Sequence, residues 1–385
     1  MQVYLDNSAT TSVLDEVIEV MNRMMRDEYG NPSSAHIMGI NAENAINNSR
    51  QIISSSINAV PKEIIFTSGG TESNNIAIKG SVDANARKGR HIITSKIEHS
   101  SVLNVFKQLE SDGYEVDYIG VSEQGIVDVD KLKNLIRDDT IFVSIMRVNN
   151  ETGVIQPVEE IGGFIRQNAK NAIFHVDAVQ AFGKMPIDVN KLKADLITLS
   201  SHKIHGPKGM GALYIKEGTK VSPVFLGGGQ EQGLRPGTEN VPAICGFATA
   251  AQIAHENIET SYNHVSKLKQ QLINGLQQNI HNCAINPADT ALAIPYILNV
   301  SFVGVRAEVL LRSLEAEGIY VSTGSACSSR RKQYSHVLQN MCICKKNIEG
   351  AVRISFSRLN TAEEISYVIE KLPSIVDRIR RYQRR

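Results

Sequence analysis

Lys203 is the residue whose type and surroundings most clearly suggest chemistry. It lies in the stretch SSHKIHGPKG, after two serines and a histidine and before a glycine–proline turn. A lysine that is partly desolvated beside other donors loses some proton affinity, so it can form an imine and act as a base. Most lysines lie on a solvated surface, but these neighbours argue against that interpretation here.

Three other polar groups also follow apolar runs. Asp177 ends the run in IFHVDAVQ, Gly69, Gly70 and Thr71 follow IIFTS, and His99 follows HIITSKIE. Asp177 could cap a helix, or it could pair with a protonated ring nitrogen, because a buried carboxylate needs a cation or several donors. The glycines could serve a tight turn or expose N–H groups to a phosphate at a helix N-terminus. His99 could be structural or could stack on an aromatic cofactor.

Alternating strands and helices must position these groups. Short apolar runs are separated by helix-length segments between about residues 13 and 258, and they read EIIFTS, HIITS, IFVSIM, AIFHVDA, DLITLS and GALYI. Continuous apolar strands between helices are typical of a mainly parallel sheet covered on both faces. Ligands collect beyond the carboxyl ends of such strands, which is where the groups described above follow their runs. The first helix is expected to begin after Ser12 as its cap.

A smaller α+β unit is expected to follow. It contains ILNVSFV, a helix over RAEVLLRSLEAEG, the strands IYVST and VRISFS, and a last helix opened by the capping box TAEE. A helix over YNHVSKLKQQLINGLQQNI is expected to link the units. The predicted division is a large domain over residues 13–258 and a small domain made of residues 1–12 and 259–385.

The composition narrows the class of protein. Among 385 residues, 41 Lys and Arg against 40 Asp and Glu give a net charge of +1, too balanced to suggest a nucleic-acid or membrane partner. No apolar run is long enough to span a bilayer, and the first residues lack the order of a signal peptide, so a cytoplasmic location is expected. Five scattered cysteines argue against a disulfide framework. Cys342 and Cys344 could hold a metal or relay sulfur, but they lack a second ligand pair, and no metal site is expected.

One cofactor would use all the groups that follow the apolar runs. Pyridoxal 5′-phosphate needs a lysine for its aldehyde, an acid for its pyridinium nitrogen and a cradle for its phosphate. A nicotinamide or nucleotide would not use Lys203 and Asp177 together, and the glycine turn lacks the Walker lysine and the dinucleotide spacing. The residues themselves therefore predict a pyridoxal-phosphate enzyme in which Lys203 binds the cofactor aldehyde.

Over nearly its whole length the chain resembles the NifS/IscS-type cysteine desulfurases of the class V aminotransferase superfamily. The resemblance rests on ten segments in the family's order: YLDNSATT, GNPSSAH, TSGGTESNN, EHSSV, VNNETG, HVDAVQ, SSHKIHGPKG, GGGQEQGLRPGTEN, STGSACSS and VRISFS. It implies the α/β fold type I of pyridoxal-phosphate transferases, with a large domain built on a mainly parallel seven-stranded sheet and a smaller α+β domain.

The resemblance also implies an activity. The protein would convert L-cysteine to L-alanine and pass the sulfur to an enzyme cysteine, and then to an acceptor protein such as an iron–sulfur scaffold or a thiolation enzyme. A selenocysteine lyase or another class V aminotransferase-like enzyme is the alternative within the superfamily. A non-catalytic sulfur carrier is the alternative from a different class.

The roles of individual residues are carried over from the same resemblance. Lys203 would bind the cofactor and remove the substrate's Cα proton, Cys327 would receive the sulfur as a persulfide, and His99 would stack on the ring and shuttle a proton. The cofactor would also contact Gly70, Thr71, Asn150, Asp177, Gln180, Ser200, His202 and, from the neighbouring subunit of a homodimer, Thr238. The substrate would be held by Asn31, Asn150 and Arg353.

Two segments depart from the family pattern. Gln232 stands where the family commonly has arginine, beside the expected subunit contact. The small residues around Cys327 favour a mobile loop, but the sequence after it, RRKQYSHVLQNMCICKKN, replaces a more typical small, proline-bearing segment. This second departure concerns the docking of the sulfur acceptor.

Overall fold

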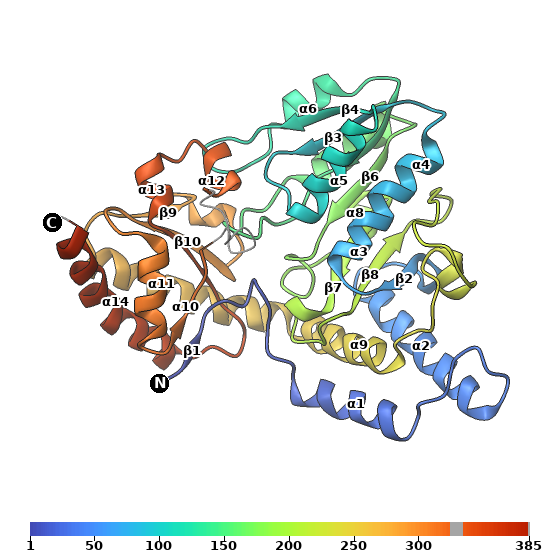
Figure 1. Ribbon diagram of the computed structural model, residues 1–385, viewed down its shortest axis with the longest axis horizontal. Helices are drawn as coiled ribbons and strands as arrows, with labels where there is room; N and C mark the ends of the chain where they lie inside the picture. Colours follow the sequence, from blue (N-terminus) through green and yellow to red (C-terminus); the bar gives the residue numbers. More distant parts are fainter. Residues whose placement is uncertain (324–333, 384–385) are drawn as a thin grey trace.

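A seven-stranded sheet forms the centre of the larger of two units in the computed structural model, which describes residues 1–323 and 334–383 (Figure 1). The strand order is β2-β8-β7-β6-β5-β3-β4, and only β8 runs antiparallel to its neighbours. The predicted mainly parallel, seven-stranded sheet is therefore confirmed. Its strands are β2 (Ile64–Thr67), β3 (His91–Ser95), β4 (Glu115–Ile119), β5 (Thr140–Ser144), β6 (Ile173–Asp177), β7 (Leu196–Ser200) and β8 (Gly211–Ile215).

The central strands are apolar along their whole length because helices cover both faces of the sheet. Neighbouring residues of β5 enter opposite cores, Phe142 on one face and Val143 on the other. The Phe142 core is closed by α4 (Ser81–Asn85), α5 (Ser100–Ser111) and the π-helical segment Ile76–Gly80, which continues α3 (Gly70–Asn75). The Val143 core is closed by α2 (Ile37–Ser55), α6 (Val129–Leu135), α7 (Val158–Asn168), α8 (Val189–Leu192) and α9 (Val241–Glu256).

The first helix begins later than the sequence predicts. Helix α1 spans Asp15–Arg26, and its N-cap is Leu14, which makes no side-chain capping bond, so the prediction of Ser12 as the cap was wrong. The cause is tertiary. The amide of Leu14 donates to the carbonyl of His205 at 3.2 Å, and the Ser12 carbonyl lies 2.9 Å from His205 Nδ1. These bonds hold residues 12–14 against the turn that follows Lys203.

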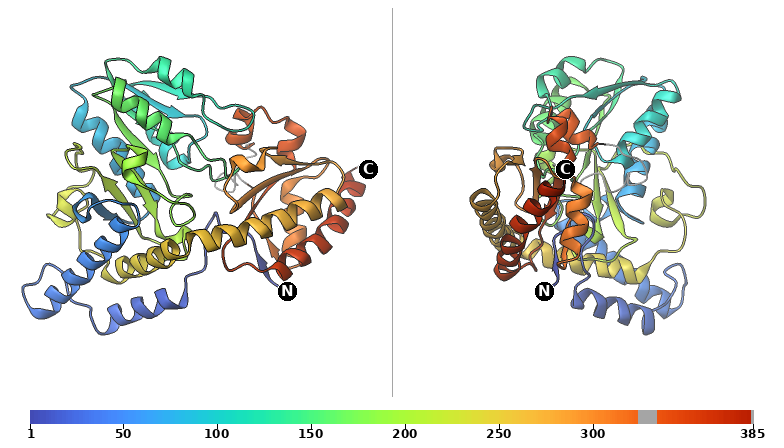
Figure 2. Two further views of the ribbon diagram at one scale, coloured as in Figure 1. Left: turned by 180° about the vertical axis from the view of Figure 1, so that it is seen from behind. Right: turned by 60° about the vertical axis from the view of Figure 1, so that its left-hand side comes forward.

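The smaller unit is an α+β structure, as predicted. An antiparallel sheet in the order β12-β10-β9 consists of β9 (Cys283–Asn286), β10 (Ile297–Phe302) and β12 (Ala351–Ser355). Its helices are α10 (Ile258–Asn279), α11 (Ala307–Glu315), α12 (His336–Asn340), α13 (Lys345–Glu349) and α14 (Ala362–Gln383). Helix α10 extends from the large unit into the small one and lies beside α14 (Figure 2).

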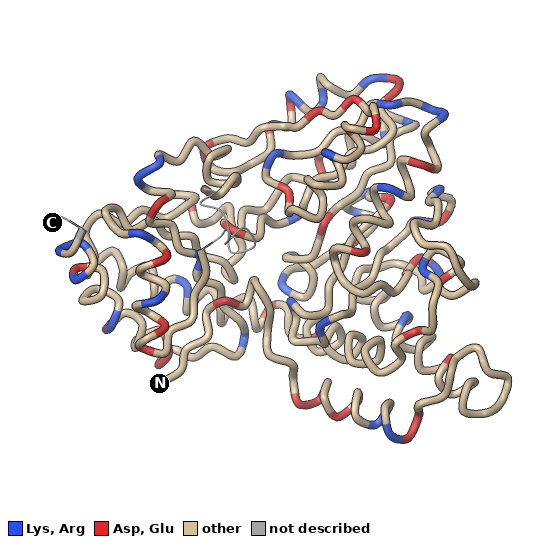
Figure 3. The backbone as a smooth tube through the Cα atoms, in the orientation of Figure 1, with Lys and Arg blue, Asp and Glu red and all other residues tan. Residues whose placement is uncertain are grey.

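The N-terminal strand joins the smaller unit. Strand β1 (Val3–Tyr4) pairs in parallel with β11 (Ile319–Tyr320), and the chain then passes to the large unit before α1. The boundary at residue 258 stays a prediction, although α9 and α10 meet there. Basic and acidic residues are interspersed over both units (Figure 3). Among the described residues, no helix combines the length and the apolar character that crossing a bilayer requires.

Candidate active site

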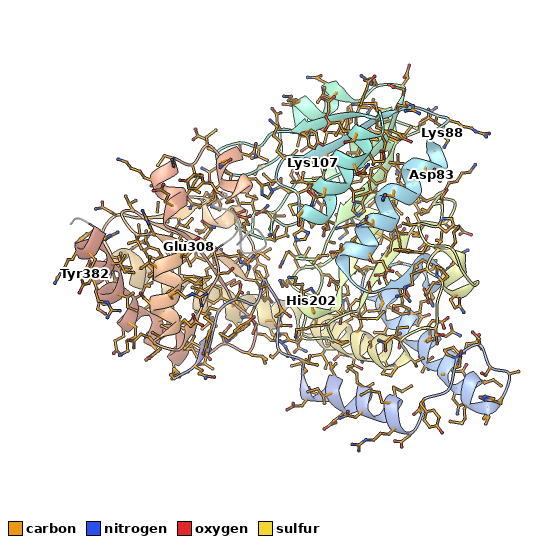
Figure 4. All side chains as sticks on the ribbon, viewed as in Figure 1. Asp83, Lys88, Lys107, His202, Glu308 and Tyr382 are labelled. Atoms are coloured by element: carbon orange, nitrogen blue, oxygen red, sulfur yellow. The ribbon has the colours of Figure 1, made fainter. Side chains whose placement is uncertain are left out.

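Lys203 lies where the two units meet. It ends a one-turn 3-10 helix, Ser201–Lys203, that directly follows β7, and the neighbouring His202 is labelled near the junction in Figure 4. The Nζ atom of Lys203 donates to the carbonyl oxygens of Ser8 and Ala9 at 2.5 and 2.6 Å. The segment that follows β1 of the small unit thus supplies two acceptors for the amine of Lys203, which lies at the edge of the large unit's sheet.

The turn after Lys203 is tightly packed at Gly206. A Cβ atom on Gly206 would lie 2.1 Å from Ser201 Oγ, which is far inside van der Waals contact. The Gly206 amide also donates to the Ser201 carbonyl at 3.2 Å, so the chain returns onto the start of the 3-10 helix that contains Lys203.

Asp177 is the last residue of β6, the strand next to β7, and its side chain is buried. Its Oδ1 accepts a hydrogen bond from the Val179 amide at 3.0 Å, and its Oδ2 accepts one from Asn74 Nδ2 at 2.9 Å. An ionised carboxylate has about four acceptor positions. Asp177 therefore supports the turn that follows β6 and not a helix, and its remaining acceptor positions leave the pairing with a protonated ring nitrogen as a prediction.

His99 is the N-cap of α5, and its ring is partly buried near Asp177 and Lys203. The Nδ1 atom accepts the Ser101 amide at 3.2 Å and lies 2.8 Å from Ser101 Oγ. Burial lowers the pKa of His99. The charge of Asp177 raises this pKa, and the charges of Lys203 and His336 lower it. The helix N-terminus acts in the same direction as burial. Both effects favour the neutral form of the ring.

A phosphate would fit at the start of α3. Gly70 is the first residue of that helix, and Ser200 lies beside it, since a Cβ on Gly70 would be 3.9 Å from Ser200 Cβ. The Ser200 hydroxyl is buried and has no hydrogen-bond partner within the described part of the chain. A buried polar atom without a partner is costly, and a phosphate oxygen would supply one. Thr71 is exposed at the same turn.

His202 lies on the same side of the site. Its Nδ1 is 3.2 Å from Thr10 Oγ1, and burial, aided by nearby lysines, lowers its pKa to about 4. The ring is therefore neutral and can donate a single N–H to an anion. The buried Ser200 hydroxyl, the α3 amides and this ring form a donor set that suits the phosphate of pyridoxal phosphate.

Arg353 of β12 connects the two units from the small side. Its side chain is buried, Nη1 donates to the Asn150 carbonyl at 2.9 Å, and Nη2 donates to Asp6 Oδ1 at 2.8 Å. The Nε atom is buried without a partner among the described residues. The structure thus brings the Arg353 side chain to the backbone of Asn150, and the substrate-binding roles of both residues stay predictions.

Asn31 and Thr238 are not brought to this junction by their own chain. Asn31 is exposed in the connection between α1 and α2, which Figure 1 shows at the outer end of the large unit, and its Oδ1 accepts the Ser33 amide at 2.9 Å. Thr238 is exposed in the loop before α9. Their predicted contacts with substrate and cofactor stay predictions.

Cys327 lies outside the described residues, but both flanks of its segment are placed. On one side, Ser322 pairs with Arg353 through two backbone hydrogen bonds of 2.7 and 3.1 Å. On the other side, the Ser335 hydroxyl donates at 2.5 Å to Oε2 of Glu151, which is the residue directly after Asn150 in the chain. The described residues on both sides of this segment therefore contact Arg353 and the residue after Asn150.

The sequence analysis missed three polar side chains at this site. They are Asn74, which donates to Asp177, Ser101, which contacts His99, and Lys184, whose Nζ donates to Gln180 Oε1 at 2.8 Å. Gln180 in turn donates from Nε2 to the Ser8 carbonyl at 3.0 Å. The one sequence signal for Lys184 was its position four residues after Gln180. For Asn74 the signal was its place after the glycine turn, and for Ser101 its place after His99.

Lys184 gives a prediction about pH and stability. Its side chain is buried, and burial, with Lys203 and Arg353, lowers its pKa from 10.5 to about 7. Between these values the unfolded chain binds more protons than the folded chain, so the free energy of unfolding should rise with pH from about 7 upward. The contribution of one group is at most about 1.4 kcal/mol per pH unit.

Lys184→Met should lack this rise in stability. Denaturant unfolding of the cofactor-free protein at several pH values would measure it, with Lys107→Met as the control because Lys107 is exposed. Parallel pH curves for Lys184→Met and the parent would contradict the assignment.

Within residues 1–323 and 334–383, no group of three or more His, Cys, Asp or Glu side chains could hold a metal ion. Cys342 and Cys344 are both exposed near the end of α12.

Comparisons with known proteins agree with the geometry. Residues 3–368 match the family Aminotransferase class-V. The chain is 48% identical to a cysteine desulfurase IscS of Methanosarcina thermophila over 98% of this chain and 93% of that protein. It is 44% identical to a cysteine desulfurase IscS of Clostridium botulinum over 97% and 94% of the two chains.

Solved structures give the same picture. A NifS-like protein, 41% identical, superposes with a TM-score of 0.92 over 98% of this chain and 100% of the other. A structure described as SspA in complex with cysteine, 35% identical, gives a TM-score of 0.81 over 94% and 100% of the two chains.

Proposed function

The chain belongs to the class-V aminotransferase family and is a pyridoxal-phosphate-dependent cysteine desulfurase, and we propose that Lys203, His99 and Cys327 carry its reaction. The protein converts L-cysteine to L-alanine and transfers the sulfur to an enzyme cysteine. The observation that carries the residue proposal is the meeting of Lys203, Asp177 and the orphaned Ser200 hydroxyl at one sheet edge.

The residues divide the chemistry among themselves. When bound, pyridoxal phosphate supplies an electron-poor ring that takes up the electrons released at the substrate Cα. Asp177 would hold the proton on the ring nitrogen, and the phosphate would be held by Ser200, His202, Thr71 and the Gly70 amide. Lys203 Nζ takes the Cα proton. Gln180 and Asn150 would flank the ring, and Gln180 would donate to its phenolic oxygen.

Sulfur transfer requires a second nucleophile. The Cys327 thiolate attacks the substrate sulfur, so an S–S bond forms while the Cβ–S bond breaks and its electron pair stays with the carbon product. The carbon product becomes alanine after protonation, and the enzyme keeps a persulfide. The flanks of the Cys327 segment support this role, because Ser322 pairs with Arg353 and Ser335 bonds to Glu151, the residue after Asn150.

Arg353→Lys should raise the KM for L-cysteine about 10- to 100-fold, with a smaller change in kcat. A lysine keeps the charge but loses the planar fork that meets a carboxylate with two hydrogen bonds. Steady-state alanine formation measures the effect, and Arg312→Lys is the control, since Arg312 is exposed on α11. Equal KM values for Arg353→Lys and the control would assign the carboxylate to another residue.

A homodimer is part of the proposal. Thr238 lies on the loop between β8 and α9, where Phe225 and Leu226 are also exposed, at 50% and 91%. Exposed apolar side chains on one loop suit a subunit contact. The loop is tied to its own subunit by the ion pair of the buried Glu231 with the partly buried Arg50, at 2.7 Å. The loop could therefore present Thr238 to the cofactor phosphate of a neighbouring subunit.

Gln232, which departs from the family pattern, contacts its own subunit. Its Nε2 donates to the Lys62 carbonyl at 2.8 Å. A cytoplasmic location and delivery of sulfur to an iron–sulfur scaffold or a thiolation enzyme stay predictions.

One experiment tests the proposal directly. Purified protein with bound cofactor is exposed to L-cysteine, alanine is quantified, and the peptide that contains Cys327 is examined by mass spectrometry for added sulfur. Added sulfur at Cys327 together with alanine supports the proposal. Pyruvate or another keto acid as the main product would favour an aminotransferase-like enzyme, and alanine from selenocysteine alone would favour a selenocysteine lyase.

A further inference from the structure

A continuous chain of hydrogen bonds joins Asp177 to His99. Asn74 Nδ2 donates to Asp177 Oδ2 at 2.9 Å and to Ser101 Oγ at 2.8 Å, and Ser101 Oγ lies 2.8 Å from His99 Nδ1. The residues come from α3, α5 and the end of β6, and Asn74 is 1% exposed. The chain therefore connects the partner of the ring nitrogen to the residue expected on the ring face.

The direction of every bond in the chain is determined. A carboxylate can only accept, so the atom of Asn74 that faces Asp177 must be the amide nitrogen. Its second hydrogen goes to Ser101 Oγ, which can still either donate to His99 Nδ1 or accept from it, so the backbone amide of Ser101 decides the direction of that bond. The Ser101 backbone amide also donates to Nδ1, at 3.2 Å. Nδ1 thus accepts twice, and the ring proton must lie on Nε2.

A proton on Nδ1 would break this arrangement. The N–H of the Ser101 amide faces Nδ1, and a backbone N–H can only donate. In an imidazolium, the N–H at Nδ1 would face this amide N–H, and neither group could accept. A neutral ring is also what stacking requires, because Asp177 keeps the cofactor nitrogen protonated and a charged histidine would place two cations face to face. The charged or titratable groups near His99 are Asp177, Lys203 and His336.

We propose that Asn74 and Ser101 are positioning residues that hold His99 neutral, with its proton on Nε2, and that Asn74 ties this histidine to the carboxylate of Asp177. The inference rests on the proposed function for the identity of the ring that His99 faces. With the proton on Nε2, His99 first acts toward the substrate as a hydrogen-bond donor. Its Nε2 atom can accept a proton only after it has released this one. The same two bonds of Asn74 orient the free acceptor positions of Asp177.

Histidine nitrogen NMR tests the proposal without any turnover. Protein labelled with ¹⁵N-histidine is measured with and without the cofactor, and the His99 signals are assigned from His99→Gln. The parent should show a pyridine-type Nδ1 and a pyrrole-type Nε2 at neutral pH. In Ser101→Ala the midpoint of His99 titration should rise by about one pH unit, the equivalent of one hydrogen bond. Ser101→Thr, which keeps the hydroxyl, should match the parent.

Asn74→Ala has a second expected effect. Besides raising the His99 midpoint, it should weaken cofactor binding about tenfold through Asp177, whereas Ser101→Ala should not. The acid limb of the pH profile of kcat/KM should move with the His99 midpoint in both variants. Matched controls are Asn75→Ala and Ser100→Ala, since both residues neighbour the chain in sequence and Asn75 bonds only to the Thr71 carbonyl among the contacts described.

The outcomes separate this inference from the proposed function. A His99 proton on Nδ1 in the parent, or His99 signals in Ser101→Ala and Asn74→Ala that match the two controls, would overturn the inference even if alanine is formed. If Asn74→Ala does not fold, Ser101→Ala alone decides. Absence of alanine from L-cysteine would overturn the function while leaving the NMR result to stand.

Discussion

Lys203→Ala should lose cysteine desulfurase activity, with kcat/KM for L-cysteine falling by at least about 10⁴-fold. The variant lacks both the amine that binds the cofactor aldehyde and the base that removes the Cα proton. The carbonyls of Ser8 and Ala9, which accept from Nζ, would remain in place, so the fold should survive. Alanine formation and the visible absorption of the bound cofactor measure the two losses together.

The control for this prediction lies on the same sheet. Lys216 is exposed and follows β8 at the opposite edge from Lys203, since Ile215 pairs with Leu196 while Gly211 pairs with Ser200. Lys216→Ala should keep the parent's activity. Borohydride reduction of the parent followed by digestion should leave the cofactor on the Lys203 peptide, and its recovery on another lysine would refute the assignment.

Cys327→Ala should abolish persulfide formation and reduce alanine formation by about 10³-fold or more, while the cofactor remains bound. The reason is that the thiolate is the only proposed acceptor for the substrate sulfur, whereas every proposed cofactor contact lies elsewhere in the chain. Mass spectrometry after exposure to L-cysteine measures the persulfide. Full sulfur transfer by Cys327→Ala would remove this residue from the mechanism.

Cys342→Ala and Cys344→Ala serve as controls for this second prediction. Both cysteines are exposed and lie on the far side of α12 from the Cys327 segment in sequence. Each variant should still form the persulfide at Cys327. If either one lost it, sulfur would have to pass through the pair, and the role of Cys327 would need revision.

The position of the reactive groups along the chain was predictable. Asp177, Lys203 and the glycine turn before α3 all follow buried apolar strands, and parallel strands bring their carboxyl ends to one edge. The sheet, its mainly parallel direction and the smaller α+β unit could be predicted for the same reason, because burial on both faces makes a strand continuously apolar.

Contacts between distant segments were not predictable from pattern. The carbonyl of Ser8 is 195 positions from Lys203 and Asp6 is 347 from Arg353, yet each pair is in hydrogen-bond contact. Local periodicity carries no information about which loop meets which. The late start of α1 has the same cause, since the bonds of residues 12–14 to the turn after Lys203 outweigh a local capping preference.

The amino-acid sequence by itself determined which residue types are available and at which strand ends they appear, and this was enough to indicate the cofactor. Only the tertiary structure decided how those residues are charged and oriented. The lowered pKa values of His99 and Lys184 and the direction of the Asp177 carboxylate all depend on burial and on partners from other elements. Desolvation and hydrogen-bond direction are properties of a packed site, so no spacing along the chain encodes them.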